Sequence, residues 1–333
     1  MERNLYLSKY FMFMSKGKGL YAILLLLVAV LAKCLLPDDK PEIIPLPQQS
    51  VSDKGDFVFD RTTTICVENE QQLPVAEELA GLFTRSAGFT PEIRIREKGN
   101  RCSVISFRTD SRLQGEHYKL DIGPSYIGIT ASGNAGFFYA VQSLRLLLPS
   151  DIESPVLVKR QRWAVPGLTI QDGPRCTSRT ILLQTPYTDI PVENVRRLID
   201  YMAILKINGL HFQQGAYSPA DEESREWKTL EEYAGRRKVT VTKGMQIPEG
   251  MVSDLPLYME QLIRRTDNWR NDETVIQLFR YLTSASEKGW RYSDDRKGLD
   301  RRRALSIRHL EGAGRQEASL ERFVTGSLTA FGR

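Results

Sequence analysis

The chain has 333 residues, of which 41% are hydrophobic and 26% are charged, and its formal net charge is +5. This length allows two domains of ordinary size, and the composition excludes wholesale disorder. The positive excess lies in the first residues and in the last third, where Arg301, Arg302 and Arg303 are consecutive. No aromatic residues alternate with these basic residues, so the sequence predicts no nucleic-acid partner.

Residues 1–36 are typical of an export leader. Three lysines, Lys9, Lys16 and Lys18, precede an apolar run over residues 22–32. A membrane-spanning helix needs about 20 apolar residues, so this shorter run favours the core of a signal peptide. We therefore expect export to the periplasm or the cell envelope.

Cys34 follows the apolar run, and the segment Leu31-Ala32-Lys33-Cys34 is similar to a bacterial lipoprotein cleavage box. In such a box the cysteine is lipidated and anchors the mature protein to a membrane. Lys33 departs from the pattern, because a small residue usually precedes the cysteine. Lipidation of Cys34 is thus one expectation, and simple secretion or an uncleaved anchor are the others.

The other cysteines and the histidines give little sign of a metal site. Cys66 and Cys102 each lie in a strand-like run, so either a disulfide between them or two free buried thiols is compatible with the sequence. The sequence has no CxxC pair, and its histidines are far apart. Zinc sites need closely spaced ligands. We therefore expect neither a metal nor another cofactor.

Residues 37–162 show alternating strand and helix patterns that predict a small α+β domain. Glycine and proline separate the two halves of a hairpin, and Pro149 ends the last helix. The expected strands are 57–59, 64–67, 93–95, 104–107, 118–122 and 126–130, and the expected helices are 74–87 and 135–148.

Residues 163–250 change to a β-α-β pattern, with a buried strand at 181–183, an amphipathic helix at 192–205 and a strand at 207–212. This order is typical of the start of a (β/α) barrel. A complete barrel takes about 250 residues, and the chain from residue 163 onward is shorter. We therefore expect an incomplete (β/α) TIM-barrel-like segment after the α+β domain.

Residues 251–333 are expected to be helical and Arg-rich, with helices near 257–264 and 273–285. No motif in this segment indicates a function.

Five motifs resemble, in the same order, those of glycoside hydrolase family 20, the β-N-acetylhexosaminidases. The resemblance runs from about residue 41 to residue 215. The family patterns are IIPxP, EGYxL, AGxFYGxQTLxQLL, DxPR and FxKRxIDxMAxxKxN. They correspond here to Ile43–Pro47, Glu116–Leu120, Ala135–Arg145, Asp172–Arg175 and Val195–Asn208.

The resemblance implies substrate-assisted hydrolysis, in which a glutamic acid protonates the glycosidic oxygen and the preceding aspartate orients the acetamido group of the substrate. The family places this pair in an HxGGDE string, which is absent from this sequence. The dipeptides Asp221-Glu222 and Asp272-Glu273 lie in polar stretches, where solvated helix starts are expected. The catalytic residues therefore stay unassigned.

Two residues of the family's sugar-binding pattern are retained. Arg179 stands in the position of the arginine in WRG, which the resemblance implies to clamp sugar hydroxyls, and a structural ion pair is the alternative. His211 stands in the position of the first histidine in HWHLTDD, as either a sugar contact or a packed histidine at a strand end. Gln184 replaces an aspartate of the pattern.

Two functions follow from the resemblance. The first is an exported β-N-acetylhexosaminidase acting on terminal N-acetylglucosamine or N-acetylgalactosamine residues of glycans. The second is a non-catalytic carbohydrate-binding relative in the cell envelope, or a truncated and degenerate remnant. General acid catalysis typically contributes about 10²- to 10⁴-fold, so without the acidic pair we expect no measurable turnover.

Overall fold

The structure is a computed structural model, and it describes residues 41–96, 105–184, 190–213, 225–246, 249–254, 273–290 and 300–310. All of these residues belong to the compact unit that begins at Pro41. The expectations for Cys34, Cys102, Asp221-Glu222 and the helix at 257–264 lie outside the described residues.

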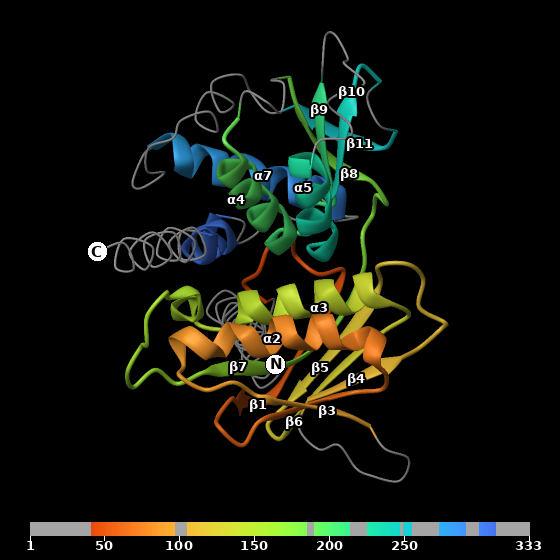
Figure 1. Cartoon of the computed structure of the whole chain (residues 1–333). Coiled ribbons are helices and arrows are strands. Elements are labelled where there is room, and N and C mark those ends of the chain that lie inside the picture. The colour runs from red at the N-terminus through yellow and green to blue at the C-terminus, as the bar shows by residue number, and fades with distance from the viewer. Residues whose placement is uncertain are drawn as a thin grey trace, which may run out of the picture. The chain divides into compact units, whose positions relative to one another are not determined.

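A seven-stranded mixed sheet forms the first layer, in the order β1-β7-β5-β6-β4-β2-β3 (Figure 1). The pairs β2–β3, β2–β4 and β4–β6 are parallel, whereas β5–β6, β5–β7 and β1–β7 are antiparallel. The strands are β1 (Gln49–Val58), β2 (Thr64–Val67), β3 (Glu92–Ile95), β4 (Ile105–Thr109), β5 (Tyr118–Gly123), β6 (Tyr126–Ala131) and β7 (Ala164–Asp172).

Two helices, α2 (Leu73–Ser86) and α3 (Asn134–Leu147), cover one face of this sheet (Figure 1). Their buried faces pack on the sheet through aromatic contacts, with ring centroids 4.5 Å apart for Phe59–Phe83 and 5.3 Å for Phe107–Phe137. Two short 3-10 helices, η1 (Glu70–Gln72) and η2 (Ser150–Glu153), precede α2 and follow α3. The predicted α+β domain is confirmed.

Strand β7 places the end of the first domain later than the sequence indicated. We expected the second segment to begin at residue 163, but β7 pairs with both β1 and β5. Pro166 and Gly167 interrupt its apolar alternation, and the backbone there approaches β1 closely: a Cβ at Gly167 would lie 2.3 Å from the carbonyl oxygen of Gly55. The first sheet therefore extends through Asp172.

A second sheet has four parallel strands in the order β10-β9-β8-β11. Its strands are β8 (Arg179–Leu183), β9 (Gly209–Gln213), β10 (Thr240–Gly244) and β11 (Met251–Asp254). Helix α4 (Val192–Ile204) connects β8 to β9, and α5 (Arg225–Arg236) lies between β9 and β10. The described residues contain no closed barrel.

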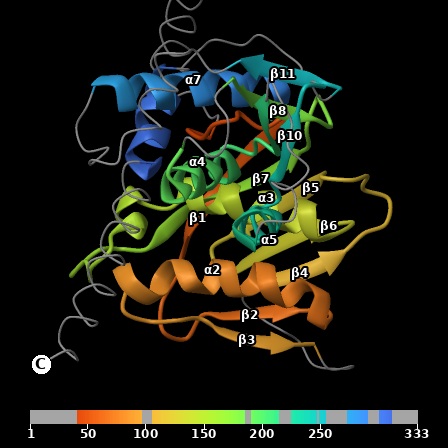
Figure 2. The same ribbon diagram turned by 45° about the horizontal axis from the view of Figure 1, so that its top comes forward.

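Helix α7 (Glu273–Trp290) packs against β8 and runs five residues beyond the helix expected at 273–285 (Figure 2). Residues 300–310 are also helical, and Arg301 forms an ion pair with Glu42. Within the ranges that the structure describes, no helix combines the length and apolarity needed to cross a membrane.

Two helical glycines provide a matched test of this packing. A Cβ at Gly136 in α3 would lie 2.6 Å from the carbonyl oxygen of His117, whereas a Cβ at Gly81 in α2 would meet no atom within 4 Å. We expect Gly136→Ala to destabilise the chain by about 1–3 kcal/mol through overpacking, and Gly81→Ala to stabilise it by about 0.5–1 kcal/mol through helix propensity. Urea unfolding of both variants checks this, and equal effects would contradict the packing of α3.

Candidate functional site

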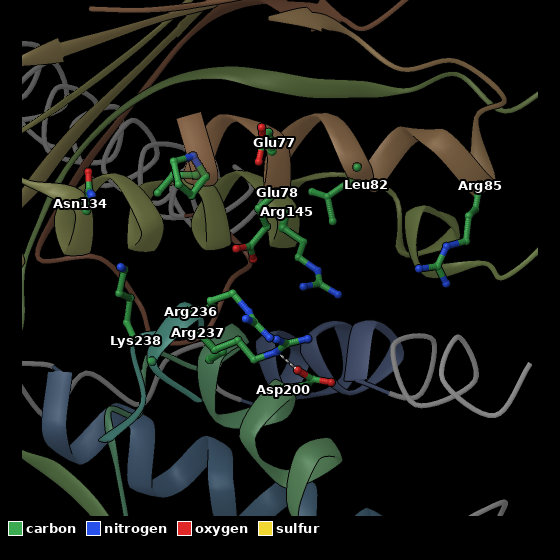
Figure 3. A pocket seen from close by; sticks show the side chains of 15 residues that line it. Glu77, Glu78, Leu82, Arg85, Asn134, Arg145, Asp200, Arg236, Arg237 and Lys238 are labelled. Carbon is green, nitrogen blue, oxygen red and sulfur yellow. Dashed lines mark hydrogen bonds and ion pairs between the residues drawn. The ribbon is translucent and has the colours of Figure 1, made fainter. Parts of the chain in front are cut away.

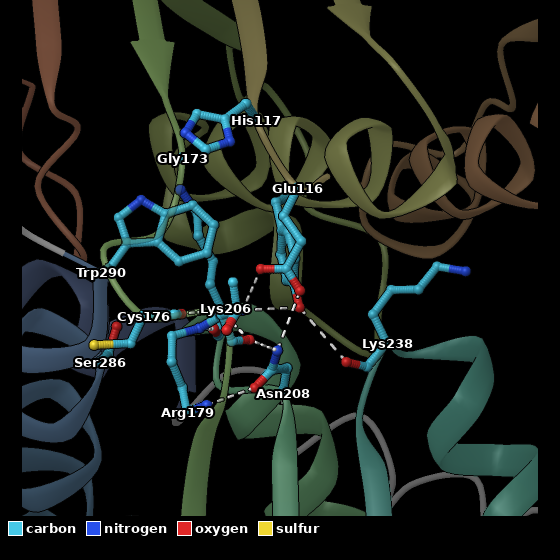
Figure 4. Close-up of polar contacts among 12 residues, drawn as sticks. Glu116, His117, Gly173, Cys176, Arg179, Lys206, Asn208, Lys238, Ser286 and Trp290 are labelled. Atoms are coloured by element: carbon cyan, nitrogen blue, oxygen red, sulfur yellow. Dashed lines mark hydrogen bonds and ion pairs between the residues drawn. The ribbon is translucent and has the colours of Figure 1, made fainter. Parts of the chain in front are cut away.

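Arg179 begins β8, and its side chain is 1% exposed. All three guanidinium nitrogens are engaged, by four hydrogen bonds and one ion pair (Figure 4). Nε donates to Lys206 O at 2.8 Å, Nη1 to Cys176 O at 2.7 Å and Thr177 O at 3.1 Å, and Nη2 to Tyr139 Oη at 3.3 Å; Nη2 also lies 2.7 Å from Glu116 Oε2.

This arrangement matches the structural ion pair that the sequence left open as the alternative for Arg179. A sugar hydroxyl could accept a hydrogen bond from Arg179 only by displacing one of these partners. The proposed sugar contact of Arg179 therefore stays a prediction.

His211 is buried in the middle of β9. Its Nδ1 lies 2.8 Å from Thr242 Oγ1, and its Nε2 lies 3.2 Å from the carbonyl oxygen of Gly244. A carbonyl only accepts, so Nε2 donates and Nδ1 accepts from the threonine. Burial lowers the pKa of His211, which is consistent with this neutral form. These contacts are those of a packed histidine, and a sugar contact of His211 stays a prediction.

Arg179 and His211 lie at different levels along the strands of the second sheet. His211 is paired with Leu182, three residues after Arg179 in β8. A strand rises about 3.3 Å per residue, so the two backbone positions are about 10 Å apart along the strand. The structure does not bring the two sugar-binding candidates together.

The cation of Lys206 is completely buried between the two sheets. Its Nζ donates to Asp172 Oδ2 at 3.0 Å and to Tyr118 Oη at 2.8 Å. The Tyr118 hydroxyl in turn donates to Asp172 Oδ2 at 2.7 Å, and Gln48 N donates to Asp172 Oδ1 at 3.1 Å. Asp172 thus links β7 to Lys206, the second residue after α4.

Burial shifts the pKa values of Lys206 and Tyr118. Burial lowers the pKa of Lys206, with Asp172 opposing the shift, and burial with the nearby Asp172 raises the pKa of Tyr118 well above its usual value. Tyr118 is therefore a neutral phenol that donates to the carboxylate and accepts from the lysine.

Trp290, the last residue of α7, covers both buried cations. Its ring centroid lies 4.9 Å from Arg179 Cζ and 4.5 Å from Lys206 Nζ, which is within cation–π range. Its Nε1 donates to Asp172 Oδ1 at 2.8 Å. The side chain of Trp290 therefore joins the two ion pairs into one buried network.

Asn208 completes the network near β9. Its Nδ2 donates to Glu116 Oε1 at 3.1 Å and to Thr177 O at 2.7 Å, while its Oδ1 accepts from the backbone N–H of Arg179 at 2.8 Å. We call the whole set the interlayer network: Glu116, Tyr118, Tyr139, Asp172, Arg179, Lys206, Asn208 and Trp290.

The interlayer network joins the first sheet and α3 to β8, α4, β9 and α7. Apart from Trp290, its members all come from the motifs on which the family resemblance rests or from the WRG position. Sequence reasoning gave a role only to Arg179 and missed the others. The available signal was the presence of charged or amide side chains within otherwise apolar motifs.

Ligands in parallel α/β sheets usually bind at the carboxyl ends of the strands. Here β8 ends at Leu183 and is followed by Gln184, and the last residue of β9 is Gln213. Strand β11 ends at Asp254. Glu273 begins α7, but the description excludes its side chain. In the described ranges no cluster of His, Cys, Asp or Glu could hold a metal ion.

The cysteines differ in state. Cys66 on β2 is disulfide-bonded, so the expectation of a free thiol there is wrong. Its pairing with Cys102 stays a prediction. Cys176 is free and half-buried.

Comparison with known proteins assigns the first domain to a family. Residues 40–173 match the model of glycosyl hydrolase family 20, domain 2. Residues 40–173 are therefore a partial domain of family 20.

Individual relatives agree with this assignment. The chain is 34% identical over 171 residues to a β-hexosaminidase of Porphyromonas gingivalis and 27% identical over 177 residues to a β-N-acetylhexosaminidase of Cellulomonas fimi. Each alignment covers 51% of this chain, but only 22% and 34% of the respective relative.

Solved structures give the same result. The family 20 β-N-acetylhexosaminidase of Streptomyces coelicolor superposes with a TM-score of 0.54 at 26% identity, over 64% of this chain and 47% of that one. A mutant Streptomyces plicatus β-hexosaminidase in complex with its product N-acetylglucosamine gives 0.53 at 28% identity, over 63% and 46%. The chain thus spans less than half the length of each of these relatives.

The interlayer network predicts a large stability effect at Lys206. Lys206→Met leaves the buried carboxylate of Asp172 without a cation, and breaking a buried ion pair costs about 3–5 kcal/mol. The double variant Asp172→Asn/Lys206→Met should lose less than the sum of the single changes, because the two residues are coupled. Urea unfolding measures both.

Lys228→Met, on the exposed face of α5, is the matched control, and we expect a change within about 0.5 kcal/mol. A Lys206→Met variant as stable as this control would show that the network contributes nothing to folding.

Proposed function

We propose that this chain is an exported protein on a β-N-acetylhexosaminidase scaffold that recognises terminal N-acetylhexosamine residues and does not hydrolyse them. The observation that carries the absence of turnover is the lack of an HxGGDE string in the whole sequence. Without an enclosed acid of raised pKa, the glycosidic oxygen receives no proton.

We also propose that the second sheet is the beginning of an incomplete (β/α) barrel. Strands β8, β9 and β10 are adjacent and parallel, with a helix between each consecutive pair. Strand β11 pairs with the other side of β8. In a barrel, this side of the first strand is where the last strand closes the sheet.

The proposed ligand class comes from the relatives. The Streptomyces plicatus enzyme is described in complex with N-acetylglucosamine, and family membership of the first domain supports a similar ligand here. Terminal N-acetylglucosamine or N-acetylgalactosamine of a glycan is therefore the proposed ligand. The alternative, an active β-N-acetylhexosaminidase, differs from this carbohydrate-binding protein only in turnover.

A chromogenic N-acetylglucosaminide tests this proposal. We expect the purified chain to release no more chromophore than a buffer blank, while the Cellulomonas fimi relative serves as the positive control. Calorimetry with N-acetylglucosamine should detect binding. Saturable release by the chain would overturn the proposed lack of hydrolysis, and no heat of binding would overturn the proposed recognition.

Export is supported by the leader and by the disulfide at Cys66, because disulfides persist in oxidising compartments. We propose that the mature protein is lipid-anchored through Cys34. Cells fed a labelled fatty acid should label the chain, and Cys34→Ser should lose the label and leave the membrane fraction. Cys176→Ser is the matched control and should keep it. Equal labelling of both variants would contradict the anchor.

A further inference from the structure

A cavity of about 810 Å³ with many charged lining residues lies where α2 and α3 of the first domain face α4 and the end of α5 (Figure 3). It is separate from the sheet ends at which a sugar site of the second sheet would form. Its volume is within the range of about 300–1,000 Å³ typical of small-molecule sites.

Arg145 of α3 is the fixed element of this cavity. Its Nε and Nη2 each donate to one oxygen of Glu153 at 2.6 Å, and its side chain is 14% exposed. Burial alone would raise the pKa of Glu153, but Arg145 outweighs it and the pKa falls to about 2, so the pair stays ionised. His309 Nδ1 adds a contact to Glu153 at 3.4 Å.

The remaining nitrogen of Arg145 is available to a ligand. Among the described residues, Nη1 has no hydrogen-bond partner, and it is not enclosed by protein. Because Glu153 fixes one edge of the guanidinium, the other edge is held toward the cavity without further loss of side-chain entropy.

Three acids line the cavity, Glu77, Glu78 and Asp200; Glu77 is exposed, and the other two are engaged by their neighbours. Asp200 accepts from the Tyr233 hydroxyl at 2.8 and 2.9 Å and forms an ion pair with Arg237. Glu78 accepts from Gln142 Nε2 at 2.7 Å. Burial raises the pKa of Glu78, which favours its neutral form over a buried carboxylate.

The lining carries an excess of cations, because five basic residues face these three acids: Arg85, Arg145, Arg236, Arg237 and Lys238. Arg236 and Lys238 approach from the α5 side, opposite Arg145 and Glu78 (Figure 3). Within the described part of the chain, neither side chain has an ion-pair or hydrogen-bond partner. Basic residues at the end of α5 also stabilise the helix dipole, but this does not account for Arg145, which comes from the other domain.

We propose that this cavity binds the oxyanion group of a small ligand, a sulfate, phosphate or carboxylate, between Arg145 on one side and Arg236 and Lys238 on the other. Forked arginine donors bind such groups bidentately. The cavity is much larger than one anion, so we infer a ligand of sugar size that carries the charge. This inference is independent of any glycoside hydrolysis.

Calorimetry on the full chain with inorganic sulfate, inorganic phosphate, N-acetylglucosamine 6-sulfate and neutral N-acetylglucosamine tests the proposal. The double variant Arg236→Ala/Lys238→Ala should weaken binding of the anionic probes by about tenfold or more, a loss typical of a charge-assisted contact. The matched control Arg225→Ala/Lys228→Ala removes the same charge from the exposed start of α5 and should stay within about twofold of the wild type.

Tighter binding of the sulfated sugar than of inorganic sulfate supports a sugar-borne anion, and equal binding supports a free anion in the same cavity. Equal losses in the two double variants, or no saturable binding of any anionic probe, would overturn the site. Binding of neutral N-acetylglucosamine that is unchanged in Arg236→Ala/Lys238→Ala belongs to the proposed glycan recognition, so the two proposals fail separately.

Discussion

The buried cation of Lys206 is the constraint on which the arrangement of the two layers depends. A charge removed from water costs several kcal/mol unless it is paired and hydrogen-bonded. Asp172 and Tyr118 supply those contacts from the first sheet, and Trp290 supplies a ring from α7. The chain enters β9 three residues after Lys206, so the position of the second sheet is tied to the position of this ammonium group.

The same need to pair a buried charge explains why Arg179 can lie in the interior. Arg179 holds the turn before β8 through the carbonyl groups of Cys176 and Thr177, and it reaches α3 through Tyr139. A side chain with so many structural partners stabilises the fold whether or not a glycan is present.

Local elements could be predicted from the sequence, and long-range contacts could not. The apolar spacing gave α2, α3 and the β5–β6 hairpin to within a residue or two, since side-chain periodicity is a local property. Strand β7 was missed because Pro166 and Gly167 break its alternation. The pairing of Lys206 with Asp172, 34 residues apart, depends on how two layers pack, and no spacing within either motif encodes that distance.

The position of Trp290 gives α7 a structural role that no sequence motif indicated. The carbonyl groups of Gly289 and Trp290 accept from the N–H groups of Cys176 and Arg175, and the Ser286 hydroxyl donates to the carbonyl of Leu205. The last turn of α7 thus shields the charged groups of Arg179 and Lys206 from water. A shortened form ending before residue 290 would expose those charged groups to solvent, so a minimal folded fragment has to include Trp290.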